Sequence, residues 1–427
     1  MPTPAPLVAV LTLIFLSRTS LADWPQFRGP DGNGTAAEAS TPVKWSDNEN
    51  IVWKTPLPGR GASSAIVWGD RIFLTAYTGY GENPDDLETP GNKADLRLHV
   101  LSFERETGKL LWDSEIPASA DTQNYSKRIA DHGYATGTPA TDGEAVYAYF
   151  GVSGLVAFDF SGKLLWRAET GIGTAGFGSA SSPVLHGDLV LVNASIESDT
   201  LFAFDRKTGK EVWKTGPINR AWTSPCLVTA PDGKTELVLN HKDEVVGYDA
   251  LTGEKLWWCA AIDDYIVPVP ITHDGIVYCL GGRSNRSLAI KPGGRGDVTE
   301  THKLWQKSIG ANVTSPVYFD GHLYWASDKG VQCCLRAADG EEVYRERLPT
   351  RARIYASIVR AGKHFYVTTR DAGIVVLDAV PEYREVATNV IASDETMVNA
   401  SPAVSGDQLL LRTDRFLYCV GETSSTD

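Results

Sequence analysis

The sequence predicts an all-β fold: an eight-bladed β-propeller of four-stranded antiparallel blades, with the ring closed by an N-terminal strand. Three observations predict it. Related segments recur about every 44 residues along the chain, a period typical of propellers. The 427 residues include 40 Gly, 23 Pro and 12 Trp, which suit short strands and tight turns. No helical hydrophobic period continues over three turns.

The first 22 residues are expected to be a signal peptide. The apolar stretch from Leu7 to Leu16 is too short to span a bilayer. Ser20-Leu21-Ala22 then matches the small-x-small pattern of a cleavage site. The region before the apolar stretch lacks Lys and Arg, so an uncleaved anchor is the alternative. We therefore expect one exported domain, residues 23–427, periplasmic or secreted, with no transmembrane segment in the mature chain.

Two segments define the repeat unit. The first is "AFDRKTGKEVW" at residues 203–213, with relatives at 102–112, 157–166 and 247–257. The second contains a Pro that recurs from Pro139 to Pro316 in steps of 44, 42, 45 and 46 residues. Pro402 follows 86 residues later, and Ile358 occupies the intervening Pro position. Tight Asp-Gly or Gly-Asp turns within the second segment indicate hairpins, so each unit reads as four strands.

The residues that the units share have structural explanations. Gly209 supplies the positive φ of the turn between the third and fourth strands. Asp205 accepts hydrogen bonds from the backbone of that turn. A Trp on the fourth strand presents its flat face to a neighbouring sheet, and its indole N–H requires an acceptor. The Trp residues in this position are Trp112, Trp166, Trp213, Trp257 and Trp305.

The two ends of the chain complement each other. The eighth unit, which starts near Pro402, ends without a fourth strand. The segment "NIVWKT" at residues 50–55 is a spare strand with Trp53 in the expected place. We expect residues 50–55 to complete the last blade and remove both free edges.

The repeat resembles that of PQQ-like (quinoprotein alcohol dehydrogenase-like) propellers, A-x-D-x-x-T-G-K-x-x-W. The opening "DWPQFRGPDGNG" at residues 23–34 also resembles the start of such chains. The resemblance covers nearly the whole mature chain and implies the eight-bladed fold. It implies two branches of function: oxidation of alcohols with pyrroloquinoline quinone (PQQ) and Ca²⁺, and cofactor-free propellers of the BamB type, which serve outer-membrane β-barrel assembly.

In such propellers the residues just before each first strand surround the mouth of the central tunnel. One interpretation is that they cap strand ends and pair with nearby acids. The other is a pocket for an anion or a quinone, built from Arg forks and aromatic faces. Insertions at 77–96 and 121–133 fall on the same face, as a lid or as solvated loops. The candidate binding residues are Arg60, His132, Tyr134, Arg220, Trp222, Tyr265, Asn312, Arg353, Tyr355 and Asn399.

No metal site or catalytic residue is identified from the sequence. The six Cys match no zinc-ligand spacing. The family's dehydrogenases can carry a disulfide between adjacent cysteines, but Cys333 and Cys334 fall within a predicted strand, where neighbours face opposite sides. We therefore expect these two to pack in the core. The family's Glu, Asn and Asp calcium ligands have no assigned counterparts, so PQQ with Ca²⁺ remains an implication of the resemblance alone.

We expect a binding module that acts through the tunnel mouth. Its expected ligands are an anionic small molecule or an acidic peptide, and its expected protein partners are other envelope proteins. The alternatives are a PQQ-dependent (quinoprotein) alcohol or sugar dehydrogenase and a cell-envelope scaffold. The net charge of −13 argues against nucleic-acid binding, and we expect a monomer.

Overall fold

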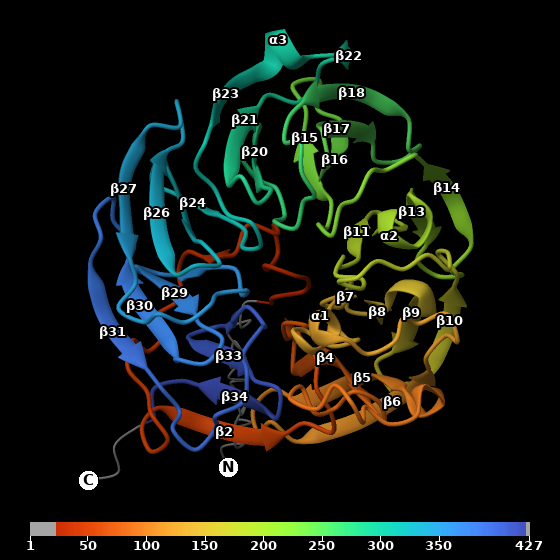
Figure 1. Ribbon diagram of the computed structural model, residues 1–427, viewed down its shortest axis with the longest axis vertical. Coiled ribbons are helices and arrows are strands. Elements are labelled where there is room, and N and C mark those ends of the chain that lie inside the picture. Colours follow the sequence, from red (N-terminus) through yellow and green to blue (C-terminus); the bar gives the residue numbers. More distant parts are fainter. Residues whose placement is uncertain (1–22, 424–427) are drawn as a thin grey trace, which may run out of the picture.

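The computed structural model describes residues 23–423, which form a closed ring of eight antiparallel blades (Figure 1). The predicted fold is confirmed. The strands of blades 1 to 4 are β3 (Ile66–Trp68), β4 (Arg71–Thr78), β5 (Arg97–Glu104), β6 (Leu110–Pro117); β7 (Ala140–Thr141), β8 (Ala145–Tyr149), β9 (Leu155–Asp159), β10 (Leu164–Ala168); β11 (Val184–His186), β12 (Leu189–Ala194), β13 (Thr200–Asp205), β14 (Glu211–Thr215); and β15 (Cys226–Thr229), β16 (Thr235–His241), β17 (Glu244–Asp249), β18 (Lys255–Ala260).

Blades 5 to 8 repeat the same order from the tunnel outward. Their strands are β19 (Ile271–His273), β20 (Ile276–Gly281), β21 (Arg286–Ile290), β23 (Lys303–Lys307); β24 (Val317–Phe319), β25 (His322–Ala326), β26 (Val331–Arg336), β27 (Glu342–Arg347); β28 (Val359–Ala361), β29 (His364–Thr368), β30 (Ile374–Asp378), β31 (Glu385–Asn389); and β32 (Ala403–Ser405), β33 (Gln408–Arg412), β34 (Phe416–Val420), β2 (Ile51–Pro56).

Short elements lie between or beside the blades. Strands β1 (Thr35–Ala36) and β22 (Gly296–Asp297) pair in parallel with β28 and β18. The helices are α1 (Lys127–Ala130), α2 (Ser195–Ser198), α3 (Thr299–His302), η1 (Lys93–Asp95) and η2 (Gly151–Ser153). No helix among the described residues is long and apolar enough to cross a membrane.

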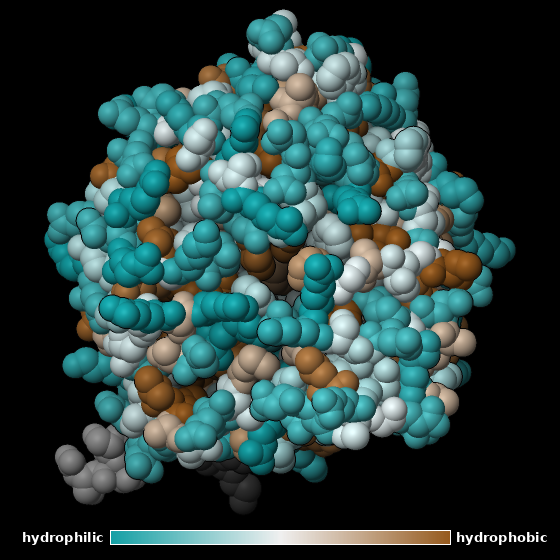
Figure 2. All heavy atoms as spheres, viewed as in Figure 1, coloured by the Kyte–Doolittle hydropathy of each residue, from teal (hydrophilic) through white to brown (hydrophobic). Residues whose placement is uncertain are grey.

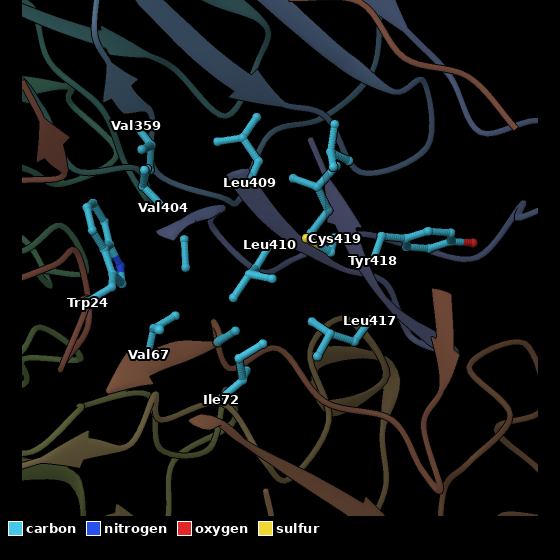
Figure 3. Close-up of a cluster of buried hydrophobic side chains, with 14 of the residues drawn as sticks. Trp24, Val67, Ile72, Val359, Val404, Leu409, Leu410, Leu417, Tyr418 and Cys419 are labelled. Carbon is cyan, nitrogen blue, oxygen red and sulfur yellow. The ribbon is translucent and has the colours of Figure 1, made fainter. Parts of the chain in front are cut away.

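Strand β2 closes the ring as the outermost strand of blade 8. It pairs antiparallel with β34, with Trp53 opposite Cys419. The core lies between the blades, and Figure 3 shows the cluster at the closure, where Leu410 and Leu417 of blade 8 face Val67 and Ile72 of blade 1. Joining the first and last blades in this way leaves neither with an open face.

Tryptophans link successive blades around the outside of the ring. The Trp166 ring lies against Gly209 of the next blade, and its indole N–H donates to the Arg206 carbonyl at 3.0 Å. Trp112 and Trp305 make the same contacts with Gly162 and Gly340, donating to carbonyls at 2.9 Å. Asp205 accepts from the Thr208 backbone and hydroxyl at 2.8 and 2.7 Å, which holds the turn. The repeated Trp and Gly are therefore the two halves of one interblade contact.

Two of the predicted Trp residues depart from this pattern. Trp213 lies against Gly253, but its indole N–H has no hydrogen-bond partner in the described structure. Trp257 packs on Gly247 of its own blade and donates to Glu236 Oε2 at 2.7 Å. The corresponding turn of blade 5 is replaced by residues 291–302, and Glu236 accepts from the Gly293 N–H of that insertion at 3.1 Å. A buried carboxylate therefore makes the interblade link here.

A ring of hydroxyl groups surrounds the tunnel at the start of the first strands. In six cases the backbone N–H of one blade donates to the hydroxyl of the next, at 2.8–3.0 Å. The position is Ser or Thr in seven of the eight blades: Ser64, Thr138, Ser182, Ser224, Val269, Ser315, Ser357 and Ser401. The Ser that precedes the recurrent Pro thus satisfies a buried backbone donor.

The N-terminal residues 23–36 cross the tunnel, as the red segment at the centre of Figure 1 shows. Trp24 pairs with Val67 of blade 1, and Asn33 exchanges two 3.1 Å hydrogen bonds with Thr272 of blade 5. Arg28 is fully buried and donates to the carbonyls of Pro316 and Ile358 in blades 6 and 7. The repeat pattern gives no sign of this plug, because residues 23–36 lie outside the repeated units.

Candidate functional site

The tunnel mouth contains a cavity of about 260 Å³. Figure 2 shows a hollow at the centre of this face with hydrophobic side chains in its depth. Phe27 of the plug is among the lining residues, together with the serines of the hydroxyl ring. Six of the ten predicted binding residues line the cavity: His132, Trp222, Tyr265, Asn312, Tyr355 and Asn399.

Aromatic side chains form one wall of the cavity. The rings of Phe177 and Trp222 meet edge to face at 6.2 Å, and those of Trp222 and Tyr265 at 5.7 Å. The Trp222 indole N–H donates to the Gly178 carbonyl at 2.7 Å, which fixes the ring. These residues enter from the connections before blades 3, 4 and 5, so the repeat itself brings them together.

The insertion at 121–133 forms a lid that reaches across the mouth. The Asp131 carbonyl, just after α1, accepts hydrogen bonds from Arg370 at 2.8 Å and from Asn399 at 2.7 Å. The Asp131 carboxylate also pairs with Arg370 at 3.1 Å. Arg370 and Asn399 belong to blades 7 and 8, so the lid is attached to that side of the ring.

The second insertion supports this lid. Tyr80 and Tyr125 pack edge to face at 6.1 Å, and the Tyr125 N–H donates to the Tyr80 hydroxyl at 3.0 Å. Tyr134, a predicted binding residue, joins this aromatic group and lines a separate small cavity. It is therefore part of the support beneath the lid, outside the lining of the main cavity.

The three arginines predicted at the mouth do not come together there. Arg60 is buried against Asp414, with Nη2 and Oδ2 2.8 Å apart, and its pKa is raised by that carboxylate although burial opposes the shift. Arg220 and Arg353 are exposed and lie outside the cavity lining. The fold therefore does not bring the three arginines into one site. Arg60 is directed to Asp414, and Arg220 and Arg353 are directed to solvent.

Other arginines reach the mouth by stacking on its aromatic rings. Arg128 lies 4.9 Å from the centre of the Phe177 ring, Arg283 4.9 Å from that of Tyr265, and Arg370 4.4 Å from that of Tyr355. Arg128 comes from the lid and the other two from connections between second and third strands. Their position depends on loop conformation, which the repeat pattern does not encode.

Two polar side chains in the lining lack partners. The amide oxygen of Asn312 is buried without a hydrogen bond in the described structure. The Asp328 carboxylate makes no hydrogen bond or ion pair with any described residue, whereas Asp131 is neutralised by Arg370. Burial lowers the pKa of His132, which favours its neutral form. The half-buried Asp328 carboxylate is therefore the one acidic group of the described lining without a protein partner.

The residues present do not fit PQQ in this cavity. The quinone carries three carboxylates and needs cationic donors, but none of the described lining residues is Arg or Lys. The volume also falls below the 300–1,000 Å³ or so typical of sites for drug-sized ligands. No group of three or more His, Cys, Asp or Glu side chains in the described structure is arranged to hold a metal ion.

The adjacent cysteines are not among the residues that line the mouth, and they face different cores. Cys333 packs in the cluster between blades 5 and 6, and Cys334 in the cluster between blades 6 and 7. Both are free thiols. Alternation along β26 therefore separates their sulfur atoms, as the strand assignment predicted.

A second cavity, of about 480 Å³, lies between the plug and blades 3 to 5. Phe27 lines both cavities, so the plug divides the tunnel. The walls of the second cavity are largely the edges of β11 and β15 and the plug residues 26–33. Of these two cavities, the mouth cavity is the one lined by Trp and Tyr rings, and it is the stronger candidate site.

Comparison with known proteins places these features in a family. Residues 30–215, 197–295 and 294–416 match the family described as outer membrane protein assembly factor BamB. BamB of Yersinia pestis is 21% identical over 387 residues, which cover 83% of this chain and 92% of that protein. Tetrathionate hydrolase of Acidithiobacillus ferrooxidans is 21% identical over 353 residues, covering 75% of this chain and only 65% of that longer protein.

Solved structures share the fold at low sequence identity. BamB from Moraxella catarrhalis has a TM-score of 0.59 and 14% identity, with 88% of this chain and 98% of that chain covered. Quinohemoprotein alcohol dehydrogenase from Comamonas testosteroni has a TM-score of 0.62 and 11% identity, with 95% and 81% covered. At these identities the likeness establishes the fold and leaves the activity to be argued from the site.

Proposed function

Because the chain belongs to the family described as outer membrane protein assembly factor BamB, a group of PQQ-like propellers, we propose that it is a binding module that acts through its tunnel mouth. The mouth cavity, with its fixed aromatic wall and attached lid, is the observation that supports this proposal. Sites that bind small ligands or side chains are typically concave, largely apolar and pre-formed, with a few polar groups.

The proposed cellular setting is the envelope. We propose that residues 1–22, which lie outside the described residues, are a signal peptide and that the mature monomer works among envelope proteins. The family description supports a protein partner, since its named member takes part in outer-membrane protein assembly. Mass analysis of the exported protein tests the first point: a mature chain that begins at Asp23 is expected, and retained Met1 would contradict cleavage.

A cavity-filling variant tests the binding function. Val267 lines the mouth cavity, and Val267→Trp should occupy its volume. The matched control is Val212→Trp on β14, where the side chain is 52% exposed on the outside of the ring. Ligand-observed NMR with small amines, carboxylates and alcohols should detect probes that bind the wild type and the control but not Val267→Trp. Equal binding by all three proteins, or by none, would contradict a mouth site.

The dehydrogenase alternative has a direct test. Purified protein incubated with PQQ and Ca²⁺ should not reduce an artificial dye in the presence of alcohols or sugars, because the lining lacks cations for the quinone. Sustained dye reduction that depends on the quinone would overturn the binding-module proposal and favour the oxidoreductase.

One observation favours the scaffold alternative. Each outer strand carries an aliphatic residue just before its interblade position, and several are 38–52% exposed: Val52, Leu111, Leu165, Val212, Leu304 and Val343. An aliphatic residue at the same position of successive outer strands offers apolar contacts to a partner that spans several blades. A photo-crosslinking amino acid at Leu165 in cells, compared with one at Val267, distinguishes the two modes. Envelope proteins captured only from Leu165 would favour the scaffold.

A further inference from the structure

We propose that the mouth cavity binds an alkylammonium group, carried either by a small amine or by a lysine side chain of a partner. This inference rests on the proposed function, because it names the ligand chemistry of the same cavity. It reverses the sign of charge that the sequence predicted for the ligand.

The charge of the lining supports a cation. The described lining contains two carboxylates, of Asp131 and Asp328, and neither Arg nor Lys. Arg370 pairs with Asp131 at 3.1 Å and is itself held by Asn399 at 2.9 Å. Asp328 has no such partner in the described structure. A bound cation would therefore complete an interaction that the protein leaves open.

The free polar atoms match an ammonium group in number and kind. An ammonium carries three donors and no acceptor. Asp328 follows β25 and Asn312 precedes β24, so both belong to blade 6 and line one side of the cavity. The Asp328 carboxylate offers acceptors that no described donor engages, and the buried Asn312 amide oxygen beside the same cavity is also unpartnered. An anion would instead meet two acceptors and be repelled.

The aromatic wall completes the site. Tyr265 enters from the connection before blade 5, which is next to blade 6 around the ring, and Trp222 enters from the connection before blade 4 and contacts Tyr265. The electron-rich face of an aromatic ring attracts an ammonium group, with Trp the strongest, and the apolar wall also accepts the alkyl stem. The small volume of about 260 Å³ suits a single side chain or a short amine.

The rim offers the competing possibility of an anion. Arg128 and Arg283 stack on Phe177 and Tyr265 but are exposed, and neither lines the cavity. They would attract carboxylates at the surface, where solvent screens them. An anion bound at the rim would not depend on Asp328, which makes the two chemistries separable.

The experiment compares three probes of the same length: n-butylammonium, n-butanol and butyrate. Titrations followed by ligand-observed NMR use the wild type, Asp328→Asn, and the control Asp320→Asn. Asp320 lies in the exposed hairpin turn between β24 and β25 of the same blade, outside the cavity lining. Circular dichroism and thermal melting confirm that each variant is folded.

Butylammonium should bind the wild type and Asp320→Asn equally, and Asp328→Asn should weaken it by about tenfold or more, the loss expected for a hydrogen bond to a charged group. Capped peptides with a central lysine or norleucine distinguish the source. If the lysine peptide binds and butylammonium does not, the natural ligand is a partner's lysine side chain. If butylammonium binds and the lysine peptide does not, the natural ligand is a small amine.

The inference is overturned if butyrate binds more tightly than butylammonium, or if Asp328→Asn leaves amine binding unchanged. If butanol or butyrate binds and Val267→Trp abolishes that binding, the mouth remains a binding site and only the alkylammonium chemistry fails. If no probe or peptide binds the wild type, both proposals fail together.

Discussion

The indole ring of Trp53 lies directly against the backbone of Gly108, and this contact joins the last blade to the first. A Cβ atom on Gly108 would come 2.3 Å from Trp53 Cε3. The indole N–H donates to the Arg105 carbonyl at 3.2 Å, and the Thr55 hydroxyl donates to the Gly108 carbonyl at 2.7 Å. Residues 53 and 55 belong to β2, so the N-terminal strand is held to blade 1 by the same Trp–Gly contact that links blades elsewhere.

Gly108→Ala should destabilise the propeller at its closure. Gly108 has a φ of +69°, and so does Gly275, where an added Cβ meets nothing within 4 Å. Gly275→Ala is therefore a control with the same backbone strain, about 1–2 kcal/mol, but without the clash. Because the new Cβ must displace Trp53, Gly108→Ala should lower the free energy of unfolding by about a further 1–3 kcal/mol. Urea unfolding measures both, and equal midpoints would show that the closing contact is unimportant.

Arg28→Met should loosen the plug. Arg28 is fully buried, and burial lowers its pKa to about 9. Its guanidinium donates only to carbonyls, including those of Gly32 at 3.2 Å and Asn33 at 3.0 Å. Losing these donors leaves the buried carbonyls of Pro316 and Ile358 unsatisfied, at about 1–3 kcal/mol each.

Arg220→Met provides the matched control for that change. Arg220 also has a positive φ, of +22°, but its side chain is exposed. A surface substitution of this kind should change the free energy of unfolding by less than about 0.5 kcal/mol. Thermal melting that ranks the two variants equally would mean that the plug adds nothing to stability.

Glu197→Gln should make stability less dependent on pH. Burial raises the pKa of the Glu197 carboxyl, although hydrogen bonds from Ser179 and Tyr149 oppose the shift. As pH rises, the unfolded chain releases this proton before the folded chain does, so the wild type loses stability through the raised pKa. Gln stays neutral in both states. The variant should therefore gain stability relative to wild type with increasing pH, and be closest to it in acid.

Denaturation at a series of pH values tests this. Glu254→Gln, at an exposed turn position, is the control and should run parallel to wild type throughout. If Glu197→Gln also runs parallel to wild type, or loses stability as pH rises, the buried carboxyl is not the group responsible.

All six cysteines should remain reduced. Burial raises the pKa of both Cys333 and Cys334 to about 12, so the nucleophilic thiolate is rare at neutral pH. Thiol titration without reductant should count six free thiols per chain after unfolding. The same thiol reagent should react only slowly with the native protein. Cys334→Ala should cost on the order of 1 kcal/mol as a small cavity. Four titratable thiols would instead indicate a disulfide.

The fold was predictable because its signals are local and repeated. Gly209 adopts a φ of +70°, and Trp213 at the end of the repeat segment packs on the turn glycine of the next blade; this pairing of Trp with Gly recurs in most of the ring. The spare strand at residues 50–55 completed the count, and β2 (Ile51–Pro56) occupies the predicted place. The departure at Trp257 follows an insertion that removes the turn glycine it would contact, which a repeat alone does not predict.

The site was predictable only in part. His132, Trp222, Tyr265, Asn312, Tyr355 and Asn399 line the cavity because chain position alone carries them to the tunnel. The direction of a long, flexible side chain depends instead on what surrounds it. Arg60 turns to Asp414, which is 354 residues away in the chain, and Arg370 of blade 7 donates to Asp131 of the lid, which is 239 residues away.

The number of blades, their strand order and the spare closing strand can be read from the sequence, because turn residues and side-chain alternation are set by residues close together in the chain and the repeat count shows which strand is left over. The charge of the mouth, the attachment of the lid and the plug of residues 23–36 emerge only in the folded chain. These depend on pairs such as Arg28 with Pro316 and Arg370 with Asp131, more than 200 residues apart. Electrostatic and hydrogen-bond partners of this kind are chosen by proximity in space, and no local pattern specifies them.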